Sequence, residues 1–320
     1  MFFWMAVFAC LFSMVFTPLA ARIGRRIGAL DVPTDWRRMH KEAIPRCGGI
    51  AIFLSFSLSC LAVCRGEAFF SSLLVGGAIL FFLGLTDDVF CVSAWVKLAV
   101  QTVAAVFAVL LSGIGGRGVI FAVLWLLLLT NAHNFVDGLD GLFAGVASVE
   151  GAALCVIFLI LGKENYALPS LLLAAACLGF RHFNRFPARI FAGDCGSETV
   201  GFLLGILSLP LFWEIPVGIG DLTPLFLFAY PLTDLSTAVL RRLLRGKSPF
   251  SADRAHLHHR VCDAGMPHRQ CTNILLLISA SMSGISVLLC RENSFLYAGI
   301  ACLLTAFLLI RLRTFIGQFA

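Results

Sequence analysis

Long apolar runs separated by short polar islands dominate the chain, and this pattern constrains the fold more than any other feature. Of the 320 residues, 59% are hydrophobic and 13% are charged, and the mean hydropathy is +0.94. A soluble domain carries roughly 45–50% apolar and about 25% charged residues. A soluble enzyme, a disordered protein and a secreted disulfide scaffold are therefore excluded. The sequence predicts an all-α polytopic membrane protein with one domain over residues 1–320.

A helix that crosses a bilayer needs about 20 mostly apolar residues, because no lipid-facing backbone group can stay unpaired. About eleven runs, several of them short, are candidates. They cover residues 1–20, 48–64, 69–86, 98–113, 118–133, 143–161, 167–183, 200–213, 222–240, 273–290 and 295–310. The first run lacks a basic leader and a small-residue cleavage site, so we expect it to be a retained helix.

The basic residues predict the orientation of the chain. If the runs cross the membrane in turn, one set of loops carries 20 of the 24 Lys and Arg residues and the other set carries four. Loops rich in Lys and Arg lie in the cytoplasm. We therefore expect the N-terminus outside, the C-terminus inside, and all the polar clusters on the cytoplasmic face.

Two adjacent carboxylates, Asp87 and Asp88, follow the third run. They stand at the unfavourable end of the helix dipole and repel each other, so their burial would require a cation or a proton. At a membrane boundary this arrangement indicates metal or base chemistry, and a solvated helix end is the alternative.

The segment that leads from the end of the fifth run into the sixth carries Asn131, Asn134, Asp137 and Asp140 at three-residue spacing. In a helix these side chains would share one face. Two glycines among them would let a ligand approach the backbone. A capping loop needs one Asp and one Gly rather than four oxygen-bearing side chains, so the segment predicts a binding site.

A third polar segment, from Phe191 to Ser197, precedes the eighth run. Its N–H groups could face a phosphate, Asp194 could hold a divalent cation, and Phe191 could stack on a base. The structural alternative is a helix N-cap by Ser197 with Glu198 in the first turn, and the two interpretations are compatible.

The basic loop at 241–270 holds Arg254, His256, His258 and His259. A zinc site is disfavoured, because Cys262 is the one cysteine near zinc spacing. A phosphate-binding surface fits the surrounding basic residues better, and a solvated basic loop near anionic lipid is the alternative.

Glu150 and Asp234 lie inside apolar runs, where a carboxylate is costly. Asp234 is expected to hold other site residues in place without contacting the substrate, and Glu150 receives no role. Taken together, the carboxylates and cations predicted for one membrane face suit Mg²⁺ and a diphosphate substrate. Because the face borders lipid, one reactant is expected to be a lipid.

From Asp31 to about Gln270, the sequence resembles the polyprenyl-phosphate N-acetylhexosamine-1-phosphate transferases. The motifs that carry the resemblance are 45–49 with His40 and Lys41, Asp87 and Asp88 with Ser93, Lys97 and Gln101, 131–142, 191–197, and 256–259. The histidine segment is similar to that of the GlcNAc-1-phosphate branch. The alternatives are the phospho-MurNAc-pentapeptide transferase of peptidoglycan synthesis, an intramembrane prenyltransferase and a nucleotide-sugar transporter.

The resemblance implies transfer of HexNAc-1-phosphate, with GlcNAc-1-phosphate favoured, from UDP-HexNAc to undecaprenyl phosphate. UMP would be released, and the product would start a cell-envelope glycopolymer. It implies a site on the cytoplasmic face of a bacterial inner membrane, no nucleic-acid partner, and a chain compatible with a homodimer. The implied cofactor is Mg²⁺, with Mn²⁺ as the alternative, because oxygen ligands suit both ions.

The resemblance also implies a role for each matching residue. Catalysis falls to Asp87 and Asp88, and metal binding to Asp194 and Asp137. The residues implied to bind the nucleotide sugar are Asn134, Gly138, Leu139, Asp140, Asn184 and Phe191. Phosphate contacts are implied for His256, His258, His259 and Arg254, and supporting positions for Lys97, Asn131 and Asp234. Some members carry a third acidic residue where this chain has Cys91, so that position is left out of the metal site.

Overall fold

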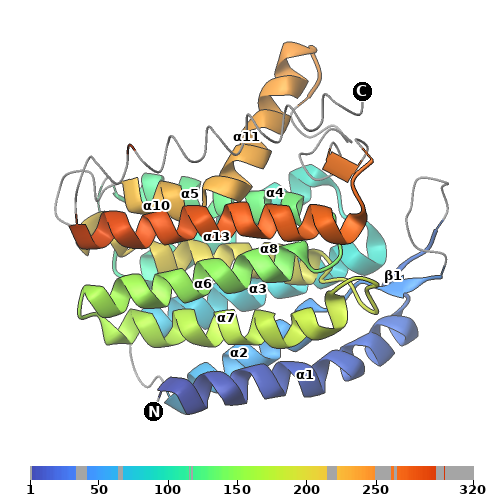
Figure 1. The fold of residues 1–320 in the computed structure, drawn as a ribbon, viewed down its shortest axis with the longest axis horizontal. Helices are drawn as coiled ribbons and strands as arrows, with labels where there is room; N and C mark the ends of the chain where they lie inside the picture. Colours follow the sequence, from blue (N-terminus) through green and yellow to red (C-terminus); the bar gives the residue numbers. More distant parts are fainter. Residues whose placement is uncertain are drawn as a thin grey trace.

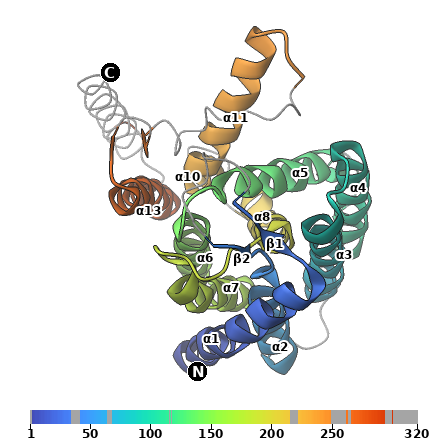
Figure 2. The same cartoon turned by 90° about the vertical axis from the view of Figure 1, so that its right-hand side faces the viewer.

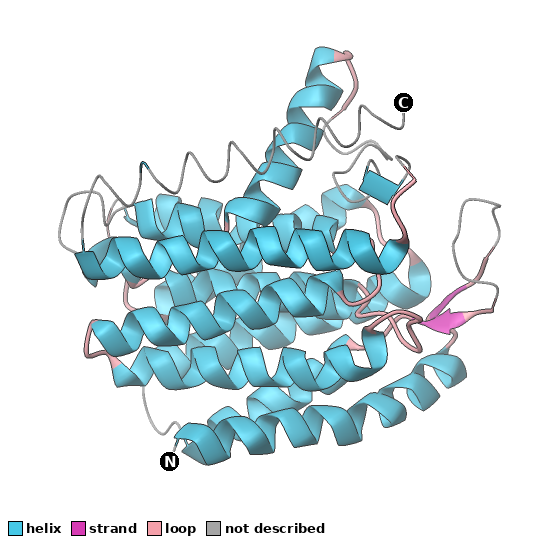
Figure 3. Ribbon diagram, viewed as in Figure 1, coloured by secondary structure: helices cyan, strands magenta, loops and turns pink. Residues whose placement is uncertain are grey.

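The computed structural model is a bundle of helices that run side by side, and most of the described residues are helical (Figures 1 and 3). It describes residues 2–33, 42–63, 68–114, 116, 118–214, 222–248, 261–262, 265–292 and 299. The long helices are α1 (Phe2–Ile27), α2 (Gly49–Val63), α3 (Ala68–Phe90), α4 (Ala94–Leu111), α5 (Gly118–Val136), α6 (Leu142–Ile160), α7 (Glu164–Asn184), α8 (Asp194–Ser208), α11 (Ala229–Leu244) and α13 (His268–Glu292). The short elements are β1 (Leu30–Asp31), β2 (Ile44–Pro45), α9 (Leu211–Glu214) and α10 (Thr223–Leu227).

Among the described residues, seven helices are long and apolar enough to cross a bilayer, namely α1, α3, α4, α5, α6, α7 and α13. The predicted run 118–133 corresponds to α5 and the run 143–161 to α6. The all-α polytopic class is therefore confirmed. The helix α2 is apolar but has 15 residues, and the run 295–310 lies outside the described residues apart from residue 299. The count of about eleven spans stays a prediction.

The run 222–240 is not one spanning helix, so that prediction is wrong. It breaks at Phe228 into α10 and α11, and α11 leaves the bundle at a steep angle (Figures 1 and 2). In a continuous helix the nitrogen of residue 231 would donate to the carbonyl oxygen of residue 227. Residue 231 is a proline, which has no N–H to donate, so the helix can change direction here.

The helix α8 lies inside the bundle, and every residue from Cys195 to Ser208 is buried (Figure 2). It packs against α3 and α5, and also against α2, α6 and α7. At Gly84 of α3 and Gly49 of α2, a Cβ atom would collide with the backbone of the first turn of α8. Glycine at these two positions lets the three helices approach closely. The start of α8 is thereby held at one end of the bundle.

Two loops pair with each other at that end. The Phe191 N–H donates to the Pro45 carbonyl at 2.8 Å, and the Gly48 N–H donates to the Phe191 carbonyl at 2.9 Å. The Gly49 N–H donates to the Ala192 carbonyl at 3.0 Å. These bonds fix the segment before α2 beside the segment before α8, near the strands β1 and β2 (Figure 2).

Candidate active site

Five carboxylates gather around the first turn of α8 and are called the acidic cluster here: Asp87, Asp88, Asp137, Asp194 and Glu198. They come from the end of α3, from the turn between α5 and α6, and from α8 itself. Two cations lie among them, from the loop before α2 and from the first turn of α4. Residues far apart in the sequence thus form one charged site.

Lys97 lies at the centre of the acidic cluster. Its Nζ atom is 3.0 Å from Asp87 Oδ2 and 2.5 Å from Glu198 Oε1, and it also contacts Asp194 Oδ2. We expected Lys97 to hold other site residues in place without contacting the substrate. The structure places its ammonium group between three carboxylates. Oxygen atoms that converge on one ammonium group mark a position that favours a cation.

The carboxylate of Asp88 is buried and engaged on both oxygens. Oδ1 accepts from the Asp194 N–H at 2.9 Å and from Arg46 Nε at 3.0 Å, and Oδ2 accepts from the Cys195 N–H at 3.1 Å. An anion at a helix N-terminus is stabilised by the free N–H groups and by the helix dipole. Asp88 therefore caps α8. The expectation that this segment's N–H groups face a phosphate is wrong for these two.

Asp87 differs from its neighbour because its side chain remains 12% exposed, whereas that of Asp88 is 0% exposed. One oxygen of Asp87 accepts from the Val92 N–H and the other from Lys97. Of the adjacent pair, Asp87 is thus the carboxylate that can meet a substrate.

A chain of hydrogen bonds joins α5 to the acidic cluster. Asn131 Nδ2 donates to Gln101 Oε1 at 3.0 Å, and Gln101 Nε2 donates to Glu198 Oε2 at 3.1 Å. Asn134 Nδ2 donates to Glu198 Oε1 at 3.4 Å and accepts at Oδ1 from Ser197 Oγ at 2.9 Å. Both asparagines therefore reach the site through Glu198.

The structure corrects two local expectations. The helix α5 ends at Val136, so Asp137 and Asp140 lie in a turn and do not share a helical face with the asparagines. Ser197 lies inside α8 rather than at its N-cap, which is Gly193 with φ +70°. A Cβ atom at Gly193 would collide with the Arg46 carbonyl and the Asp88 carboxylate. Only glycine fits comfortably at this corner of the site.

Of the residues predicted to bind the nucleotide sugar, Asn134 lies near the end of α5, and the others lie on the turn after α5 or between the end of α7 and the start of α8. The buried Asn184 accepts at Oδ1 from the Gly141 N–H and donates from Nδ2 to the Ile190 carbonyl, each at 3.0 Å. Asp140 Oδ2 accepts from the Ala188 N–H at 2.9 Å. Gly138 is exposed and Leu139 is buried. These bonds hold the loop that leads to Phe191 against the turn after α5, and the nucleotide roles stay predictions.

Some predicted residues cannot be compared with the site. Arg254, His256, His258 and His259 lie outside the described residues. Asp234 is buried on α11, one turn after Tyr230. The phosphate roles of the first four and the supporting role of Asp234 stay predictions.

The sequence interpretation missed Glu198 as a member of the site, and Arg46 as a partner of Asp88. A spacing of four residues could have revealed the first. Asp194 and Glu198 stand at positions i and i+4 of one helix, as do Lys97 and Gln101 of another, and residues at this spacing share a face. Arg46 offered no comparable pattern, because its contact with Asp88 depends on the tertiary fold.

Burial, together with neighbouring carboxylates, raises the pKa of two members of the acidic cluster. Burial, and next the charge of Asp88, raise the pKa of the Asp137 carboxyl to about 7. Burial, and next the hydrogen bond with Asp87, raise the pKa of Asp194 well above its ordinary value. Burial is the main cause of both shifts, and the neighbouring carboxylates add to it.

The donor atoms of this site suit a hard divalent cation. Within the part of the chain that the structure describes, no group of three or more His, Cys, Asp or Glu side chains converges as a preformed metal cage. Mg²⁺ usually binds through one or two carboxylates together with substrate phosphates, so such a cage is not required. Carboxylate oxygens already directed at the Lys97 ammonium fit this pattern.

Comparison with known proteins agrees with the geometry. The sequence pattern of glycosyl transferase family 4 matches residues 70–211, a stretch that includes all five carboxylates of the acidic cluster.

Three curated relatives match most of the chain. A Bacillus subtilis protein named "Probable undecaprenyl-phosphate N-acetylglucosaminyl 1-phosphate transferase" is 33% identical, over 93% of this chain and 87% of the relative. The undecaprenyl-phosphate alpha-N-acetylglucosaminyl 1-phosphate transferase of Salmonella typhi is 33% identical, over 87% and 81%. The decaprenyl-phosphate N-acetylglucosaminephosphotransferase of Mycobacterium tuberculosis is 35% identical, over 80% and 74%. The chain therefore belongs to the polyprenyl-phosphate N-acetylhexosamine-1-phosphate transferases of glycosyl transferase family 4, in the N-acetylglucosamine branch.

Proposed function

We propose that this protein transfers HexNAc-1-phosphate, with GlcNAc-1-phosphate as the favoured unit, from UDP-HexNAc to undecaprenyl phosphate. UMP is released, and the lipid-linked sugar starts a cell-envelope glycopolymer. The names of the relatives support this reaction class. The structural observation that carries it is the convergence of Asp87, Asp194 and Glu198 on one cation position at the end of a membrane-spanning bundle.

The charge of the two reactants explains the composition of the site. A nucleotide diphosphate sugar and a lipid phosphate are both anions, and phosphoryl transfer depends mainly on positioning and charge neutralisation. Asp194 and Asp137 would hold Mg²⁺ or Mn²⁺, which supplies positive charge to the diphosphate when bound. Lys97 and Arg46, each held by carboxylates, would face the remaining negative charge of the substrates.

Asp87 would accept the proton of the lipid phosphate. A phosphate oxygen of the lipid then bonds to the β-phosphorus of the UDP-sugar, the bond from that phosphorus to the bridging oxygen breaks, and UMP leaves with the electron pair. The second pKa of a phosphate is near 6, so a base assists without being indispensable. The partial exposure of Asp87 supports this assignment.

Asp88 supports the reaction from a different position. Its oxygens accept the first N–H groups of α8 and the Arg46 side chain, so it would orient Asp194 rather than meet the substrate. A mechanism through a covalent phospho-aspartate is the alternative to direct attack. In that alternative the partly exposed Asp87 is the better nucleophile.

The remaining assignments follow from the same proposal. Gly138, Leu139, Asp140, Asn184 and Phe191 would shape the nucleotide pocket, and the histidine loop would contact phosphates. The end of the bundle that carries the acidic cluster would face the cytoplasm, in the inner membrane of a bacterial cell. The 320 residues would act as one transferase domain with about eleven spans, alone or as a homodimer.

The reaction can be tested with purified protein, undecaprenyl phosphate, Mg²⁺ and UDP-GlcNAc labelled in the sugar. We expect label in the lipid fraction and an equal amount of UMP. Release of UDP instead of UMP would contradict phosphosugar transfer, and uptake of UDP-GlcNAc into vesicles without lipid product would indicate a transporter. A panel of other UDP-sugars, including UDP-MurNAc-pentapeptide, then identifies the donor.

A further inference from the structure

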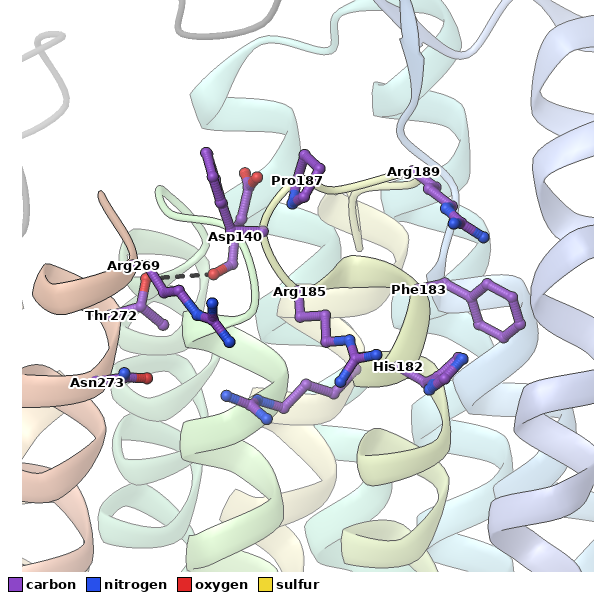
Figure 4. Close-up of a pocket in the computed structure, with 11 residues that line it drawn as sticks. Asp140, His182, Phe183, Arg185, Pro187, Arg189, Arg269, Thr272 and Asn273 are labelled. Atoms are coloured by element: carbon purple, nitrogen blue, oxygen red, sulfur yellow. Dashed lines mark hydrogen bonds between the residues drawn. The ribbon is translucent and has the colours of Figure 1, made fainter. Parts of the chain in front are cut away.

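A second charged site lies at the same end of the bundle, between the end of α7 and the start of α13 (Figure 4). It is a cavity of about 530 Å³ and is called the basic pocket here. Its charged and ionisable lining residues are Asp140, Arg181, His182, Arg185, Arg189 and Arg269. None of its lining residues comes from α3 or α8, which carry four of the five carboxylates of the acidic cluster, or from α4, which carries Lys97.

The basic pocket carries an excess of positive charge. Among the described lining residues there are four arginines and one carboxylate, that of Asp140, which accepts the Ala188 N–H. Arg181 Nε donates to the neutral Gly141 carbonyl at 3.1 Å. Across the described part of the chain, none of the four guanidinium groups forms an ion pair with a carboxylate. The acidic cluster differs, because its carboxylates and cations face each other.

This excess charge works against local stability. Arg181 lies in the last turn of α7 and Arg185 is the C-cap residue after it, so two like charges stand close together and repel each other. In Figure 4, Arg269 of α13 lies on one side of the cavity, and Arg185 and His182 lie on the other. Concave surfaces lined by one sign of charge concentrate oppositely charged ligands. The basic pocket is therefore built to receive an anion.

The position of the pocket along the helices indicates which kind of anion it binds. It lies where α7 ends and α13 begins, and both helices are long and apolar enough to span a bilayer. If these two helices cross the bilayer, their ends place the pocket at the level of the lipid phosphates. Leu178 and Leu277, further along α7 and α13, are 55% and 62% exposed. Basic pockets between membrane helices bind anionic lipid headgroups.

We propose that the basic pocket binds the phosphate headgroup of a membrane lipid, at a site distinct from the acidic cluster. Phe186 and Pro187 supply apolar wall beside the arginines, which suits an amphipathic ligand. The pocket also borders the loop between α7 and α8, which leads to Phe191 and Asp194. A bound lipid would brace this loop from its far side.

The test is native mass spectrometry of the purified full chain with lipids added one at a time. The probes are phosphatidylglycerol, cardiolipin, phosphatidylcholine and undecaprenyl phosphate, with UMP as a free phosphate. We expect Arg185→Gln/Arg269→Gln to weaken binding of a phosphate lipid about 30-fold relative to phosphatidylcholine. Each basic residue near the membrane surface contributes about 1 kcal/mol to the binding of an anionic lipid, and the variant loses two. Within the described residues, neither Arg185 nor Arg269 forms a side-chain hydrogen bond, so we expect the variant to fold.

The matched control is Arg22→Gln/Arg25→Gln, which removes two exposed arginines at the end of α1. It should leave lipid binding unchanged. Selective loss of phosphatidylglycerol or cardiolipin in the pocket variant would identify a phospholipid, and selective loss of undecaprenyl phosphate would identify the polyprenyl lipid. Equal lipid binding in wild type and pocket variant, or loss of UMP binding alone, would overturn the proposal.

Discussion

The acidic cluster and the basic pocket lie at the same end of the bundle but balance their charges differently. In the acidic cluster, Lys97 and Arg46 sit between carboxylates, and backbone N–H groups satisfy the buried Asp88. In the basic pocket, four arginines surround a cavity without a carboxylate partner among the described residues.

This difference separates a preorganised site from a receptive one. Groups that already hold each other in a low-dielectric site act on a substrate without reorganising, which favours catalysis. Groups that lack partners gain stability only when a ligand supplies the opposite charge. Single substitutions should therefore damage the acidic cluster severely and the basic pocket mildly.

Asp194→Asn should have the largest effect. The substitution keeps the shape of the side chain but removes the charge that faces Lys97 and the proposed metal ion. We expect UMP formation to fall about 1,000-fold, similar to the upper range for loss of one electrostatic catalytic group. The control is Glu164→Gln, an exposed carboxylate at the opposite end of α7, which should keep full activity. Turnover near wild type in Asp194→Asn would remove the basis of the metal assignment.

Asp87→Asn should lower kcat about 100-fold, the lower range for a general base. KM should change less, because Lys97 and Arg46 remain to hold the substrate phosphates. Steady-state kinetics with varied undecaprenyl phosphate measures both constants. An unchanged kcat would show that the lipid phosphate loses its proton without Asp87.

The sequence predicts some helices of this fold better than others. Hydropathy predicted the helices well where they are continuous, as for α5 and α6. It failed at residues 222–240, because an apolar run does not record a change of direction at Phe228. It also could not tell α8, which is buried in protein, from helices that face lipid, because both environments favour the same apolar residues.

The site was predictable where chemistry is local and hidden where it is tertiary. The unusual polar motifs pointed to Asp87, Asp88 and Asp194, and the structure brings these residues together. The capping role of Asp88 could not be read from its own neighbours, because its partners lie 106 and 107 residues away. The spacing of Glu198 from Asp194 could have placed it in the site. From the sequence, we instead placed Glu198 in the first turn of a helix capped by Ser197.

Asp88→Asn tests whether the two adjacent carboxylates have different roles. It leaves Arg46 without its buried anion and removes negative charge from the start of α8, so we expect a loss of about 2 kcal/mol in unfolding free energy. Thermal unfolding of the detergent-solubilised protein, followed by circular dichroism, measures this loss. Asp87→Asn is the matched control and should shift the midpoint less, because its partner Lys97 keeps two other carboxylates. Equal shifts in both variants would show that burial does not distinguish the pair.

Glu198→Gln should have the smallest effect within the acidic cluster. The amide can still accept from Gln101 but no longer carries the charge opposite Lys97. Partners that orient a functional group typically contribute about 10-fold to its activity, so we expect kcat/KM to fall by about that factor.

If Glu198 acts by holding Lys97, its effect should depend on that lysine. In the background of Lys97→Met, the further change Glu198→Gln should then cost little, because contacting residues are not additive. The comparison combines Arg185→Gln, in the basic pocket, with Lys97→Met. The effects of these two substitutions on kcat/KM should be additive. Additive losses for Glu198 and Lys97 would mean that Glu198 serves the reaction through Gln101 and Asn134 instead. The acidic cluster would then divide into two networks that meet at Glu198.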